Sequence, residues 1–113
     1  MATNINEIRR RVLCRLSEKK WPVDVIELFN EELIGHPEQE VQLKFRLYNH
    51  LAAKIKGKYP RIKMGGTTEC WPDLRIYERF LQNCGKNVDV LTWHMYATGK
   101  STTPLPLLFS KTD

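Results

Sequence analysis

The 113-residue sequence has no run of about 20 apolar residues, the length that a helix needs to cross a bilayer. Its first residues, MATNINEIRRRVL, lack the basic start and the continuous apolar stretch of a secretory signal peptide. It holds only three cysteines, Cys14, Cys70 and Cys84. An odd count without paired spacing predicts neither a disulfide framework nor a zinc site. We therefore interpret the cysteines as reduced, packed thiols and expect no transmembrane segment, metal or cofactor.

The composition that is present suits one small folded unit. Hydrophobic residues make up 42% of the chain, which is enough for a packed core and too many for a disordered chain. The length allows one domain, and it is well under half of the roughly 250 residues of a complete (β/α)8 barrel. We divide residues 1–113 into a helix (1–20), a strand–helix–strand–helix–strand segment (22–96) and a loop-like tail (97–113).

Hydrophobic periodicity predicts alternating helices and strands. Apolar residues recur at helical spacing in three segments, and three shorter segments have the compact pattern of strands, the first of them rich in β-branched residues. The predicted apolar stripes are Val41, Phe45, Tyr48, Ala52 and Ile55 in the second helix, and Leu74, Tyr77, Phe80 and Leu81 in the third. The predicted order is helix 4–20, buried strand 23–29, helix 37–57, short strand 61–64, helix 72–84 and strand 88–93. Such alternation is typical of a parallel sheet with right-handed crossovers, so the fold class is α/β.

Polar residues gather where the predicted strands end. Asn30 and Glu31 follow the first strand, Gly65 and Gly66 end the second, and His94 with Tyr96 follows the third. Functional groups in parallel α/β structures collect at the carboxyl ends of the strands, so we expect Glu31, Gly66 and His94 at one rim. Each of these residues also has an ordinary interpretation. Asn30 and Glu31 could start a surface loop, and Gly65 and Gly66 could form a plain turn. His94 could be a histidine with satisfied hydrogen bonds at a strand end, and Tyr96 could lie at the edge of the core.

Three of these segments resemble retaining (β/α)8 glycoside hydrolases. Residues 26–31 (IELFNE) resemble the fourth-strand signature, residues 63–66 (KMGG) the fifth strand, and residues 88–96 (VDVLTWHMY) the sixth. The resemblance covers about residues 12–103 and is strongest to the heparanase and endo-β-glucuronidase family, followed by the β-xylosidase and α-L-iduronidase family. It implies a partial TIM barrel of three parallel strands and three helices. That family is lysosomal or extracellular, although the chain shows no signal peptide.

The resemblance also implies roles for individual residues. Glu31 would be the general acid/base, Asn30 would bind a sugar hydroxyl, and His94 and Tyr96 would hold the sugar and the second carboxylate. A general acid of this kind needs a raised pKa. The implied nucleophile ends a seventh strand beyond these 113 residues, so we expect a catalytic-domain segment that is inactive alone. Glu69 is another carboxylate near the rim, without a precedent as nucleophile.

A second interpretation is a noncatalytic interaction module derived from the same fold. Three parallel strands leave two open sheet edges, which favour self-association or binding of a protein partner. A basic cluster near the end of the second helix could bind an acidic polymer; its residues are Lys54, Lys56, Lys58, Arg61 and Lys63. Cations are also favourable at a helix C-terminus, so we interpret the cluster as a solvated face and do not expect nucleic-acid binding. The sequence does not identify the substrate sugar.

Overall fold

The computed structural model describes residues 22–96 and 102–109, together with the isolated positions Glu7, Arg10, Arg11, Cys14 and Glu18. These five positions are helical, and the rest of the helix predicted over residues 1–20 lies outside the described residues. The tail differs from its prediction, because α4 (Leu105–Phe109) is a short helix rather than loop. Its prolines fall at or just before the first turn, where a missing N–H removes no helical hydrogen bond.

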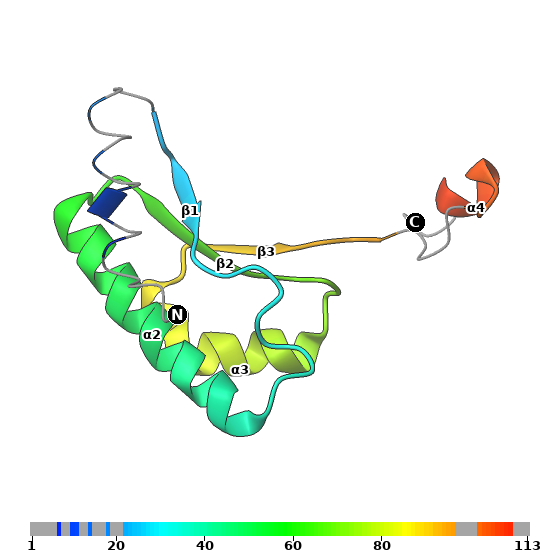
Figure 1. Cartoon of the computed structure of the whole chain (residues 1–113), viewed down its shortest axis with the longest axis horizontal. Coiled ribbons are helices and arrows are strands. Elements are labelled where there is room, and N and C mark those ends of the chain that lie inside the picture. Colours follow the sequence, from blue (N-terminus) through cyan, green and yellow to red (C-terminus); the bar gives the residue numbers. More distant parts are fainter. Residues whose placement is uncertain are drawn as a thin grey trace.

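Three strands form one parallel sheet (Figure 1). They are β1 (Val25–Glu27), β2 (Lys63–Glu69) and β3 (Val90–Trp93), paired in the order β1-β2-β3. The predicted α/β class and the parallel pairing in chain order are therefore confirmed. Since β2 is central, β1 and β3 are the two edges of the described sheet.

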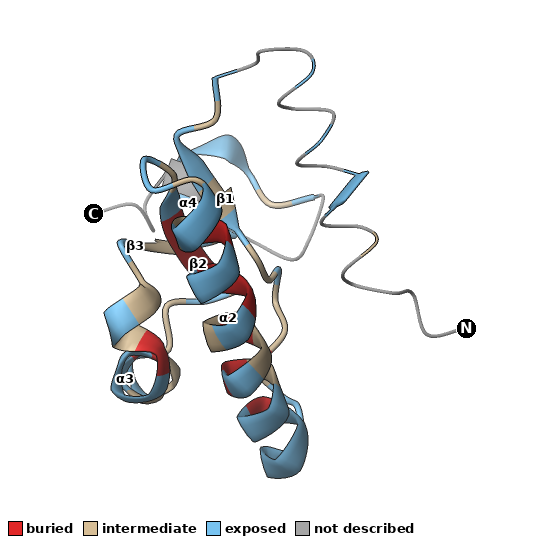
Figure 2. Ribbon diagram, turned by 90° about the vertical axis from the view of Figure 1, so that its left-hand side faces the viewer, coloured by how far each residue is buried: buried red, intermediate tan, exposed pale blue. Residues whose placement is uncertain are grey.

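Two helices cover one face of this sheet (Figure 1). The long helix α2 (Glu38–Lys58) buries the predicted apolar stripe, including Phe45 and Tyr48, and α3 (Leu74–Cys84) buries Phe80 beside it. In Figure 2 the buried residues form a band along the inner sides of the helices and β2. A single 3₁₀ turn, η1 (Gly85–Asn87), then leads toward β3.

The inner face of α3 matches its prediction only in part: Tyr77 and Phe80 are buried on it as expected. Leu74 and Leu81 were expected to share it, but both are exposed. The buried residues are Tyr77, Phe80 and Cys84, which follow i, i+3, i+7 spacing. The helix begins after Asp73, whose side chain accepts a hydrogen bond from the Arg75 N–H.

β2 is longer than predicted, and its glycines lie inside it. Gly66 pairs with Leu91 in the middle of β3, so the expectation that Gly66 lies at the rim is wrong. Gly66 has φ +146°, and a Cβ there would lie 3.3 Å from Cε2 of Tyr48. The Tyr48 hydroxyl donates to the Gly65 carbonyl at 2.9 Å. Gly66 thus allows close approach of α2 rather than forming a turn, and the strand continues to Glu69.

The other face of the sheet is only partly covered. A Cβ on Gly65 would contact Val25 and Glu27, which therefore share the face opposite the helices. Val25 is exposed, whereas Ile26 packs against the core. The prediction of a fully buried first strand is therefore wrong for its outward residues, because the described helices cover one face alone.

Candidate active site

Glu31 lies in the loop that follows β1, in an uncommon backbone conformation. Its φ is +56°, a left-handed value that few non-glycine residues adopt. The Glu31 N–H donates to the Thr68 carbonyl at 3.0 Å. This bond ties the loop after β1 to the end of β2, so the position of the Glu31 side chain depends on how β2 ends.

β2 ends in a bulge at Thr68. Thr67 pairs with Thr92 and Glu69 pairs with Trp93, which leaves Thr68 as the extra residue, with φ +55°. Its hydroxyl lies 2.9 Å from the Thr92 hydroxyl. A bulge re-aims the backbone of its strand, and here it turns the Thr68 carbonyl toward Glu31.

Glu69 also binds the loop that carries Glu31. Its side chain is fully buried and accepts hydrogen bonds from the Leu33 N–H (3.2 Å), the Ile34 N–H (3.1 Å) and the Thr67 hydroxyl (2.7 Å). Its carbonyl accepts from the His94 N–H at 2.8 Å. Glu69 therefore positions both the loop that carries Glu31 and the start of the segment that carries His94. No local pattern indicates this role, since the backbone donors lie 35 and 36 residues away in the sequence.

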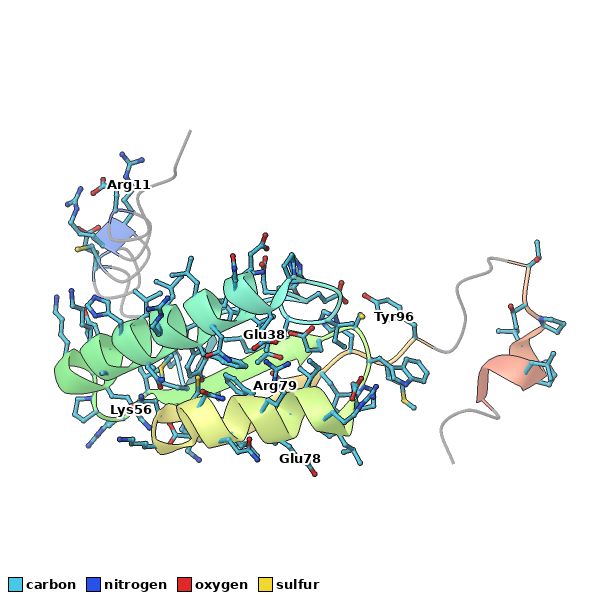
Figure 3. All side chains as sticks on the ribbon, turned by 90° about the horizontal axis from the view of Figure 1, so that it is seen from below. Arg11, Glu38, Lys56, Glu78, Arg79 and Tyr96 are labelled. Carbon is cyan, nitrogen blue, oxygen red and sulfur yellow. The ribbon has the colours of Figure 1, made fainter. Side chains whose placement is uncertain are left out.

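Three of the four predicted site residues converge at this rim. The Nδ1 atom of His94 lies 2.6 Å from Oε1 of Glu31, and the Tyr96 hydroxyl donates to the same oxygen at 3.0 Å. The partners are 63 and 65 residues apart in sequence. Figure 3 shows Tyr96 where the chain leaves the sheet. Asn30 is exposed and outside this hydrogen-bonded group.

These contacts set the charge of Glu31. The hydrogen bond with His94, and then that from Tyr96, hold the pKa of Glu31 below its ordinary value of 4.5. Glu31 in turn raises the pKa of Tyr96. The raised pKa expected for a general acid is therefore not present in this chain. The physical reason is that the Glu31 side chain is 32% exposed and both contacts favour the carboxylate.

We expect His94→Ala and Tyr96→Phe each to move the Glu31 pKa back toward 4.5, with the larger effect from His94→Ala. Because the folded-state pKa is depressed, the contribution of Glu31 to stability is present above its unfolded pKa and is lost as pH falls through the folded pKa. Carbon-13 NMR titration of the Glu31 carboxyl measures the shift. Tyr59→Phe is the matched control, and an unchanged Glu31 pKa in both test variants would contradict the assignment.

An open hollow of about 400 Å³ lies beside this group. It is lined by Glu27, Thr68, Leu91, Thr92, Trp93 and His94. His94 thus faces both Glu31 and the hollow. Glu27 was not among the residues predicted for the site, and Trp93 had no predicted role of its own. Their signals were weak: Glu27 shares the outward face of β1 with Val25, and Trp93 is the last residue of β3.

Tyr77 joins the helices to this rim. Its hydroxyl donates to the Thr92 carbonyl at 2.7 Å and accepts from the Glu69 N–H at 3.2 Å. Its ring meets the Trp93 ring edge-on, with 6.5 Å between centroids. Trp93 is thereby supported on one side while it remains about half exposed, so the indole is available to a ligand.

Within residues 22–96 and 102–109, no group of three or more His, Cys, Asp or Glu side chains is arranged to hold a metal ion. No helix in that part of the chain is long and apolar enough to cross a membrane. No family model, curated protein or solved structure matches the chain.

Proposed function

We propose that this chain is a segment of the catalytic domain of a retaining O-glycosidase, and that Glu31 is its acid/base residue. One observation carries the proposal. A carboxylate after β1 accepts hydrogen bonds from a histidine and a tyrosine after β3, beside an open hollow with an exposed tryptophan. These groups meet at the carboxyl ends of parallel strands, which is where (β/α)8 enzymes place their active sites.

The sheet is compatible with part of such a barrel. In a (β/α)8 barrel, helices cover the outside of the sheet and the opposite face fills the interior. Here α2 and α3 cover one face (Figure 1), and Val25 and Glu27 lie on the other. We propose that this open face corresponds to the interior of the barrel and that β1 and β3 pair with further strands. On this proposal, β1, β2 and β3 correspond to the fourth, fifth and sixth strands of the barrel, as the resemblance implies.

The proposed mechanism has two steps. In the first, the Glu31 carboxyl gives its proton to the glycosidic oxygen as the bond to the anomeric carbon breaks and a second carboxylate bonds to that carbon. In the second, the Glu31 carboxylate takes a proton from the water that displaces the second carboxylate. His94 and Tyr96 favour the ionised form that the second step needs. A negative charge on the second carboxylate raises the pKa of Glu31 toward the form that the first step needs.

Glu69 does not fit the role of the second carboxylate. It is fully buried and both of its oxygens are occupied by the loop and by Thr67. The resemblance instead implies a glutamate at the end of a further strand. We therefore expect little turnover of aryl glycosides by the 113-residue chain alone. Robust turnover that is lost in Glu27→Gln would contradict this expectation, because Glu27 would then be the second carboxylate.

The proposal is tested by assaying the polypeptide encoded by the reading frame that contains this chain. We expect it to supply a strand ending in Glu beyond residue 113 and to hydrolyse aryl xylosides or glucuronides with retention of the anomeric configuration, followed by proton NMR. Inversion, or a reading frame without such a strand, would contradict the proposal. If that polypeptide binds a protein partner but hydrolyses no glycoside, the interaction module is favoured instead. The exposed Val25, Trp93 and Met95 supply apolar contacts for such a module.

A further inference from the structure

Charge is distributed unevenly between the two ends of the sheet. The chain has a formal charge of +5, but its basic cluster lies toward the amino ends of the strands. Lys56 and Lys58 are in the last turn of α2, and Lys63 begins β2. The carboxyl ends carry Glu27, where β1 stops, and Glu31 in the loop beyond.

The hollow at the carboxyl ends has no cation of its own to offer an acidic ligand. None of its described lining residues is Lys or Arg, and Glu27 contributes a carboxylate. His94, which also lines it, is engaged with Glu31 at 2.6 Å. Lys44 reaches the loop after β1, but its ammonium is bound by the Glu32 carboxylate at 3.0 Å and the Glu32 carbonyl at 2.6 Å.

The remaining lining of the hollow suits an uncharged polar ring. Thr68 and Thr92 present hydroxyl groups 2.9 Å apart, each able to donate and accept. Trp93 is 52% exposed and offers an aromatic surface, against which the C–H face of a sugar ring packs. A carboxylate such as Glu27 accepts hydrogen bonds from sugar hydroxyls but repels a uronate or a sulfate.

We propose that the hollow binds an uncharged sugar and discriminates against acidic sugars through Glu27. This inference rests on the proposed glycosidase function and narrows its substrate class. It differs from the endo-β-glucuronidase activity of the family that the sequence resembles most, because an acidic sugar would meet like charge at the rim.

The test compares two sugars that differ only at C6: methyl β-D-glucoside and methyl β-D-glucuronide. Each is titrated at low salt and neutral pH into the ¹⁵N-labelled 113-residue chain, with the Trp93 indole N–H and the Thr92 amide as reporters. We expect the glucoside to shift both signals and the glucuronide to bind about tenfold more weakly. Added salt should reduce the difference between them.

Two variants test which residue binds the sugar and which residue discriminates against the acidic sugar. Trp93→Ala should abolish the shift of the Thr92 amide. Glu27→Gln, which keeps the shape of the side chain, should reduce the difference in affinity between the two sugars. Trp71→Ala is the matched control, because Trp71 is 49% exposed and is not part of the hollow's lining. It should leave both affinities unchanged.

Two results would overturn the inference. Equal or tighter binding of the glucuronide at Trp93 would show that the hollow accepts acidic sugars, and the glycosidase proposal would stand. Absence of any shift with either sugar would show that the hollow is not a sugar site in this chain. The glycosidase proposal would then be decided by the stereochemistry of turnover, which does not depend on this titration.

Discussion

Replacement of Glu31 by alanine is expected to slow hydrolysis of alkyl glycosides by the polypeptide that contains this chain by about 10²–10⁴-fold, the usual contribution of general acid–base catalysis. An alkoxide leaves poorly unless it receives a proton as the bond breaks. A dinitrophenolate leaves without that proton, so the first step should survive in Glu31→Ala with a dinitrophenyl glycoside. The second step should then limit the rate, because water is no longer activated.

Azide provides the diagnostic measurement. It needs no general base, and the alanine variant leaves room for it beside His94 and Tyr96. We expect azide to restore turnover of the dinitrophenyl substrate in Glu31→Ala and to yield a glycosyl azide of retained configuration. Glu32→Gln is the matched control, since the neighbouring carboxylate binds Lys44 instead. If Glu31→Ala lost turnover equally with both leaving groups and azide restored none of it, the acid/base assignment would be contradicted.

Replacement of Glu69 by glutamine is expected to destabilise the chain by about 3 kcal/mol. The three donors that bind Glu69 come from Leu33, Ile34 and Thr67, and the amide of glutamine puts an N–H₂ group against at least one of them. A lost hydrogen bond to a charged group costs about 1.5–3 kcal/mol, and an unsatisfied buried donor adds about 1–3 kcal/mol. Urea unfolding of the 113-residue chain measures the change.

Glu40→Gln is the control for this substitution. Glu40 is exposed in α2 and contacts His36 at 3.2 Å, so its loss should change the free energy of unfolding by at most about 0.5 kcal/mol. The Glu69 variant should also loosen the loop at residues 30–34, visible as loss of the Glu31–His94 contact in NMR spectra. A stability change in Glu69→Gln as small as that of the control would show that Glu69 does not organise the rim.

The order of the elements could be predicted from the sequence because it depends on local pattern. Alternating helical and β-branched segments indicated a parallel α/β sheet, and helical spacing identified Phe45 and Tyr48 as core residues. The convergence of Glu31 with His94 and Tyr96 followed from the same reasoning, since residues that end parallel strands share one rim. None of this required knowledge of a specific tertiary contact.

Only the tertiary structure decided how that rim is built. Gly66 proved to be strand interior because β2 pairs with β3 on both sides of it. Glu69 became a buried anchor because backbone donors 35 and 36 residues away bind it. The lowered pKa of Glu31 likewise depends on two donors supplied by the segment after β3. Periodicity reports which face of an element is apolar, but the partners of a polar group are chosen by packing between distant segments.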